Sequence, residues 1–319
     1  MQDALIFIDT NILLDFYRIR GDTGGLSLLD RIDKNHPHII TTYQVEMEYK
    51  KNRQRVILES LARIRTPDWS GLAAPAFLWH AQPARKLAKS KDEITKQLRK
   101  LKTRTAAILQ KPWWNDGVYQ VLQRLFKDRG PYNLSREKKI RYQIRRLARK
   151  RFGMGYPPRK DNDTSIADAV NWEWIVNCAK ESGKNIIIVS RDTDYGSRYD
   201  DNTILNDWLS QEFKERISRR RKITLTDRLT HAFKMISVKV TKREEEDEKG
   251  LLDFDLDAFS ARLRSLQEQV SVVKKELSSQ LQPSVESFSQ AVTSIAERYP
   301  DLAKSAPIES ELEKSGQDK

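Results

Sequence analysis

The sequence predicts a three-layer α/β/α fold around a parallel sheet, and three observations predict it. Short apolar runs at residues 4–8 and 185–190 are typical of buried strands. Helix-forming stretches alternate with strand-forming ones, which favours parallel strands joined by helices. The chain has 319 residues, enough for one large domain or two small ones with an ample core.

The first strand, residues 4–8, ends in Asp9 and passes at once into an apolar helix. Thr10 or Asn11 can cap this helix. The turn at residues 33–37 precedes a second strand. The elements expected in this part are helices over 11–20 and 26–32, a strand over 38–41, and a long helix from Thr42 or Tyr43 to about Arg65.

Residues 66–160 are expected to form a basic helical insertion. Between residues 81 and 151 there are 22 Lys and Arg but only 5 Asp and Glu. Apolar residues recur at helical spacing, so the segment is expected to fold. Pro112 and Gly130-Pro131 divide it into about three helices.

The sheet is expected to continue after the glycines and prolines of residues 153–158. A helix over 165–181, capped by Asp163 or Thr164, ends at Gly183. The strand over 185–190 follows it directly. The last expected elements are a helix over 204–217, a strand over 223–225 and a helix over 226–236.

The chain beyond residue 240 is expected to form a separate region. Residues 241–254 contain the acidic run 244–248 and are expected to be a charged linker. Residues 255–300 carry apolar residues at three- and four-residue spacing, which predicts amphipathic or coiled-coil helices. These heptads would pair with a second chain or another protein, or fold back at Pro283. Residues 301–319 form a polar tail.

The composition narrows the class of function. The net charge of +13 predicts a polyanionic partner, nucleic acid first. The single cysteine, Cys178, excludes an internal disulfide, and the four histidines lack zinc-ligand spacing. No apolar run reaches membrane-spanning length, and no basic secretory start is present. A cytoplasmic protein without membrane contact is expected.

Four acidic positions fall where they can converge. Asp9 ends the first strand, Glu48 lies early in the helix after the second, Asp168 lies early in the 165–181 helix, and Asp192 follows the 185–190 strand. In a parallel sheet, strand ends and the starts of the following helices share one edge. Clustered carboxylates repel unless a cation neutralises them, and oxygen ligands suit Mg²⁺ or Mn²⁺.

These motifs resemble the PIN-domain nucleases, in a variety with a long helical insertion. The resemblance rests on four motifs: Ile8-Asp9-Thr10-Asn11-Ile12-Leu13, Thr42-Tyr43-Gln44-Val45 leading to Glu48 and Asn52-Arg53, Ile166-Ala167-Asp168-Ala169-Val170, and Ile187-Ile188-Val189-Ser190-Arg191-Asp192. It spans residues 1 to about 65 and 160 to 240. It implies a metal-dependent ribonuclease whose four acids are Asp9, Glu48, Asp168 and Asp192, supported by Asn11 and Ser190.

Several assignments stay open at this point. Glu46 competes with Glu48, although the spacing from Thr42 favours Glu48. Asp194 would bind metal or orient Asp192. Asp161 and Asp163 are expected to be loop and cap residues. The residues expected to contact nucleic acid are Arg53, Lys100, Arg104, Arg145, Arg146 and Arg149.

Three functions remain in competition. The first is an endoribonuclease that uses carboxylate-bound divalent metal to hydrolyse phosphodiester bonds. The second is a nuclease that cuts DNA or a branched structure, since no motif for the 2′-hydroxyl is visible. The third is a non-catalytic nucleic-acid-binding scaffold. A haloacid-dehalogenase-type phosphohydrolase ranks last, because Asn11 stands where its second Asp belongs.

Overall fold

A computed structural model describes residues 3–19, 24–62, 64, 69, 74–159, 165–200 and 202–250 of the chain. The chain divides into two compact units, residues 1–252 and 253–319. The second unit lies outside the described residues. The expected heptads at 255–300 and the tail at 301–319 therefore lie outside them too.

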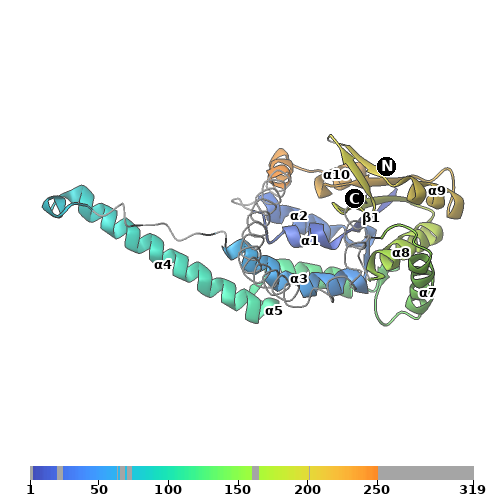
Figure 1. The fold of residues 1–319 in the computed structure, drawn as a ribbon, viewed down its shortest axis with the longest axis horizontal. Coiled ribbons are helices and arrows are strands. Elements are labelled where there is room, and N and C mark those ends of the chain that lie inside the picture. Colours follow the sequence, from blue (N-terminus) through green and yellow to red (C-terminus); the bar gives the residue numbers. More distant parts are fainter. Residues whose placement is uncertain are drawn as a thin grey trace, which may run out of the picture. The chain divides into compact units, whose positions relative to one another are not determined.

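A five-stranded parallel sheet forms the centre of the first unit (Figure 1). Its order is β3-β2-β1-β4-β7, so the first strand of the chain lies in the middle. All side chains of β1 are buried, as the apolar run predicts. The strands are β1 (Ala4–Ile8), β2 (Ile39–Thr42), β3 (Asn133–Leu134), β4 (Asn185–Val189) and β7 (Ile223–Thr226).

Helices flank this sheet, which confirms the predicted α/β/α fold. Packed apolar side chains from strands and helices form one continuous core. Thr42 ties two helices together at the end of β2: its hydroxyl accepts from the Val45 N–H and donates to Asn171 on α8. The helices are α1 (Thr10–Asp15), α2 (Gly24–Lys34), α3 (Tyr43–Ala62), α8 (Ala167–Ser182), α9 (Asp207–Arg216) and α10 (Leu229–Met235), with a 3-10 turn at His36–His38.

Residues 66–160 differ from a simple helical insertion. They contain α4 (Gln82–Gln110), α5 (Pro112–Asn115), α6 (Gly117–Lys127) and α7 (Ile140–Gly153), besides β3. The helices α6 and α7 contribute Leu122, Leu125 and Ile144 to the core. Neither α4 nor the one-turn helix α5 has a buried residue.

The expected helix over 204–217 begins later, because a hairpin precedes it. Strands β5 (Gly196–Tyr199) and β6 (Asn202–Leu205) pair antiparallel, and α9 starts at Asp207. Gly196 allows the close pairing, since a Cβ there would lie 2.0 Å from the Ile204 carbonyl oxygen. The Asn206 side chain caps α9 by accepting from Trp208 and Leu209.

The segment expected to be a linker packs on the domain instead. Residues 242–250 are helical. Glu244 is buried and accepts hydrogen bonds from Ser27 and Arg31 of α2. The domain therefore continues past the expected boundary at residue 240. No helix within the described ranges is both long and apolar enough to cross a membrane.

Candidate active site

Asp9 sits at the carboxyl end of the central strand, where its side chain caps α1. It is 4% exposed. It accepts hydrogen bonds from the Thr10 N–H at 2.6 Å, from Asn11 Nδ2 at 3.2 Å and from Ser190 Oγ at 2.5 Å. The expected supporting residues Asn11 and Ser190 thus both hold this carboxylate.

Two further expected acids connect to Asp9 through its neighbours. Thr10 Oγ1 donates to Glu48 Oε2 at 3.0 Å, across the gap between α1 and α3. Ser190 Oγ accepts from the Asp192 N–H at 3.0 Å. Glu46, the competitor of Glu48, pairs with Lys50 on the same helix. The geometry therefore favours Glu48 as the acid of α3 that belongs to this edge of the sheet.

The electrostatics show that these carboxylates interact. Burial, and then the charge of Asp192, raise the pKa of Asp9 to about 7. Glu48 adds to the rise, while the hydrogen bonds from Ser190 and Thr10 oppose it. A carboxylate in this position is costly when ionised and would be stabilised by a nearby cation.

Tyr195 shows that Asp168 belongs to the same neighbourhood. Its ring is fully buried beside Phe7 of β1. Burial raises its pKa far above the usual range, and the charges of Asp168, Asp9, Asp192 and Glu48 raise it further. Its buried hydroxyl has no hydrogen-bond partner among the described residues. Sequence reasoning missed this residue, because an aromatic side chain near a strand is usually a core residue.

The donor set suits a hard divalent cation in its chemistry and location. All four acids supply oxygen, at the edge where parallel α/β sheets bind ligands. Among the described residues, however, no group of three His, Cys, Asp or Glu side chains is arranged to hold a metal ion. Asp194 lies in the turn after Asp192, and Asp161 and Asp163 lie outside the described residues.

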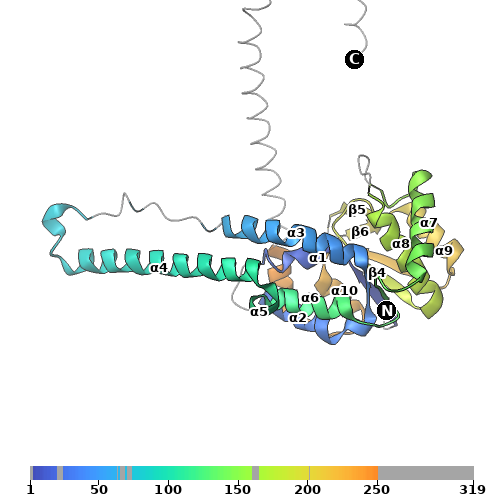
Figure 2. The same ribbon diagram turned by 90° about the horizontal axis from the view of Figure 1, so that it is seen from below.

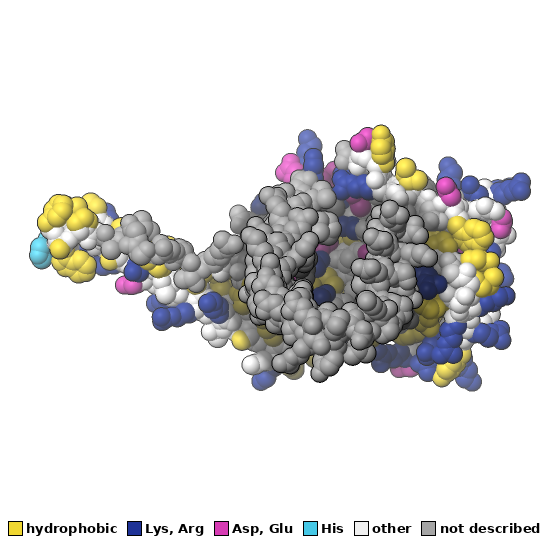
Figure 3. All heavy atoms as spheres, in the orientation of Figure 1, with side chains coloured by type: hydrophobic (Ala, Val, Ile, Leu, Met, Phe, Trp, Pro, Cys, Tyr) yellow, Lys and Arg dark blue, Asp and Glu magenta, His cyan; other side chains and the backbone are white. Residues whose placement is uncertain are grey.

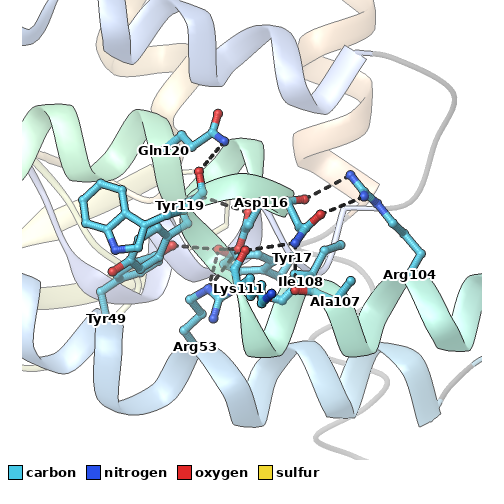
Figure 4. A network of polar contacts seen from close by, with 12 residues as sticks. Tyr17, Tyr49, Arg53, Arg104, Ala107, Ile108, Lys111, Asp116, Tyr119 and Gln120 are labelled. Carbon is cyan, nitrogen blue, oxygen red and sulfur yellow. Dashed lines mark hydrogen bonds and ion pairs between the residues drawn. The ribbon is translucent and has the colours of Figure 1, made fainter.

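Arg53 was expected to contact nucleic acid, but it is buried. The side chain of Arg53 pairs with Asp116 through Nη2 at 2.5 Å, and Nη2 also donates to the Ile108 carbonyl. Tyr17 joins the same network, which ties α3 to α4 and α6 (Figure 4). Since Arg53 is only 3% exposed, it cannot form part of a nucleic-acid surface.

The other expected cations separate into two surfaces. Lys100 and Arg104 lie exposed on α4, where Arg104 also bonds Asn115 of α5. Arg145, Arg146 and Arg149 lie on α7.

The positive charge on and just before α7 acts on the start of α3. Burial raises the pKa of Tyr43, the first residue of α3, and the charges of four arginines oppose that rise. Because Tyr43 follows the carboxyl end of β2, the positive charge of these arginines acts at the β2 end of the acidic edge. Four arginines make up this group, and none of them forms an ion pair within the described residues: Arg136, Arg141, Arg145 and Arg149.

Acids at the carboxyl ends of the strands of an open parallel α/β sheet lie where proteins of this class bind their ligands. The match to protein families is narrower: residues 6–195 match the PIN domain. The chain therefore belongs to the PIN-domain family, whose members are generally nucleases. The match runs through the basic insertion, which lies outside the ranges that carry the motif resemblance. No curated protein matches the chain, and neither does any solved structure.

Proposed function

We propose that this protein is a metal-dependent endoribonuclease that hydrolyses phosphodiester bonds, leaving a 5′-phosphate and a 3′-hydroxyl. Asp9, Glu48, Asp168 and Asp192 would hold Mg²⁺ or Mn²⁺, with Asp194 assisting. The observation that carries the proposal is that the charges of all four acids act on the buried Tyr195, while those of Asp192 and Glu48 act on Asp9. A bound divalent cation would lower the pKa of water and neutralise charge on the phosphate.

The residues of the chain would have distinct roles. Ser190 and Asn11 orient Asp9 through hydrogen bonds, and Thr10 orients Glu48. Arg141, Arg145 and Arg149 of α7 would bind phosphates on the β2 side of the acidic edge, because none of these three forms an ion pair among the described residues. Arg145 and Arg149 are one turn apart and carry like charge, an arrangement that destabilises an isolated helix and that a phosphate backbone would relieve.

A non-catalytic nucleic-acid-binding protein is the second candidate. The observation favouring it is that the described residues hold no ready-made group of three metal ligands. It predicts that substituting Asp9 leaves nucleic-acid binding unchanged and that the wild type cuts no substrate.

The deciding experiment incubates the purified full chain with labelled single-stranded RNA, single-stranded DNA and duplex. Each is tested with Mn²⁺, with Mg²⁺ and with EDTA. Asp9→Asn and Asp192→Asn serve as matched variants, with Asp207→Asn as an exposed control on α9. We expect cleavage of RNA with metal, none in EDTA, and a loss of at least 100-fold in the two site variants only.

The other outcomes separate the candidates. Cleavage of DNA alone would replace RNA by DNA as substrate. Metal-dependent cleavage that survives both site substitutions would reject the assigned acids. Binding of RNA without cleavage of any substrate, in either metal, would favour the scaffold.

A further inference from the structure

The helix α4 extends away from the body of the domain. It has 29 residues, which at helical rise is about 43 Å, and none of them is buried. Its C-terminal end is held by Arg53, which donates to the Ile108 carbonyl, and by Arg104, which bonds Asn115. Figures 1 and 2 both show the rest of the helix reaching outward from α3 and α5. Packing in the hydrophobic core therefore does not explain why the chain contains this helix.

One side of α4 carries a row of positive charge. The helix contains nine Lys and Arg but only two acids, Asp92 and Glu93. At 100° per residue, four of the cations fall on one side, while Leu87, Ile94 and Leu101 fall on the other. None of the four forms an ion pair within the described residues, and neighbours in the row repel each other. The row is Arg85, Lys89, Lys96 and Lys100.

The free end of α4 presents aromatic side chains. A 3-10 turn, Ala76–Leu78, precedes the helix, and Phe77 is 83% exposed while Trp79 is 63% exposed. The turn is fixed by backbone bonds from Leu78 to Pro75 and from Trp79 to Ala76. Figure 3 shows hydrophobic side chains gathered at this end. Exposed aromatic groups beside cations are the combination that stacks bases and neutralises phosphates.

We propose that residues 76–110 form a nucleic-acid-binding arm that holds the substrate at a distance from the acidic edge. The basic row binds backbone phosphates, and Phe77 and Trp79 stack on unpaired bases. This inference rests on the proposed function for its ligand and adds the substrate class: long RNA with an unpaired segment. A stacked hexanucleotide spans about 20 Å, so it cannot fill the cleavage site and reach the tip together.

The test measures binding separately from cleavage. All proteins carry Asp9→Asn, so that RNA stays intact, and the probes are a fluorescein-labelled unstructured 40-mer and a hexamer. The row variant is Lys96→Gln/Lys100→Gln, which keeps helix propensity, and the tip variant is Phe77→Ala/Trp79→Ala. The controls are Arg219→Gln/Arg220→Gln, exposed after α9, and Trp114→Ala, which is 83% exposed at the opposite end of α4. Circular dichroism checks that each variant keeps its helix.

Both arm variants are expected to raise the Kd for the 40-mer about tenfold and the Kd for the hexamer much less, because the hexamer is too short to be held by the arm and the acidic edge together. The row variant should also lower the slope of log K against log salt by about 1.4, the value for two lost contacts to a single strand. The two controls should change neither. Equal losses in control and arm variants would overturn the proposal, and so would unchanged 40-mer binding in both arm variants.

Two further readouts distinguish RNA binding by the arm from cleavage and from membrane binding. With Asp9 restored, arm variants should cut the hexamer as fast as the wild type; absence of cleavage there would reject the nuclease but leave the binding result standing. Vesicles of phosphatidylcholine and phosphatidylserine provide the competing ligand. Vesicle binding that depends on Phe77 and Trp79, with RNA binding unaffected, would assign the arm to a membrane surface and overturn the proposal.

Discussion

The Ser190 hydroxyl joins the ends of two neighbouring strands: it donates to Asp9 Oδ2 at 2.5 Å and accepts from the Asp192 N–H at 3.0 Å. One small side chain thus sets both the position of the β1 carboxylate and the path of the chain after β4. Alanine at this position would free both.

Ser190→Ala should therefore lower metal-dependent cleavage without preventing folding. Groups that orient metal ligands are worth about 10- to 100-fold in affinity or activity. We expect the apparent affinity for Mn²⁺, read from the metal dependence of cleavage, to fall within that range. Ser190→Thr keeps the hydroxyl and should restore most of the loss. A structural role alone would change the free energy of unfolding but leave the metal dependence of the folded protein as it was.

Asp9→Asn should stabilise the protein when metal is absent. The pKa of Asp9 in the folded state is about 7, above the usual 3.8, so the folded state favours the protonated acid. The resulting stability is complete below about pH 4 and lost as the pH rises through 7. At pH 8 in EDTA, asparagine avoids this penalty of up to about 4 kcal/mol. Urea unfolding at pH 4 and pH 8 should show a variant advantage only at the higher pH.

A bound divalent cation should make the wild type more stable than Asp9→Asn at pH 8. Adding Mn²⁺ at pH 8 is expected to raise the Tm of the wild type, because ligand binding to the native state stabilises it. Asp9→Asn should gain far less. Equal Tm shifts in the two proteins would mean that the cation binds elsewhere, and the assignment of a metal to the Asp9 site would be rejected.

Arg53→Met tests whether the buried arginine is structural. It leaves the carboxylate of Asp116 buried without its positively charged partner, which typically costs about 3–5 kcal/mol. Urea unfolding should show that loss, whereas Arg55→Met, at an exposed position two residues away, should change stability little. RNA affinity of folded Arg53→Met protein is expected to match that of the wild type. A selective loss of RNA binding without a loss of stability would mean that Arg53 contacts nucleic acid after all.

The parts of the fold that could be predicted are those fixed by local patterns. The strands β1 and β4 are apolar runs with no polar interruption after their first residue, and an acid follows closely in each case. Their place in a parallel sheet follows from the helices between them, so Asp9 and Asp192 could be assigned to one edge. The start of α3 after Thr42 could also be predicted, because threonine is a common helix-capping residue and its hydroxyl accepts from the Val45 N–H.

The parts that could not be predicted depend on distant partners. The two residues of β3 are a strand only because they pair with β2. Arg53 looks like any surface cation on a basic helix until Asp116, on another helix, encloses it. Tyr195 becomes a candidate site residue only when four separate parts of the chain bring their acids near it. The acidic run 244–248 resembles a linker because nothing local reveals that Ser27 and Arg31 face Glu244.

Glu244→Gln tests that last contact. Burial opposes ionisation of this carboxylate, but hydrogen bonds from Arg31, Ser27 and Thr241 outweigh it and lower the pKa of Glu244 to about 2. A depressed pKa contributes stability that is present above about 4.5, the usual value, and is lost as the pH falls through 2. The wild type should exceed the variant by about 3 kcal/mol at pH 7, and the gap should narrow steadily between pH 4.5 and pH 2. Glu245→Gln, whose partner Lys234 is exposed, is the matched control and should show almost no gap. Identical unfolding curves for wild type and Glu244→Gln at pH 7 would mean that residues 242–250 do not pack on α2.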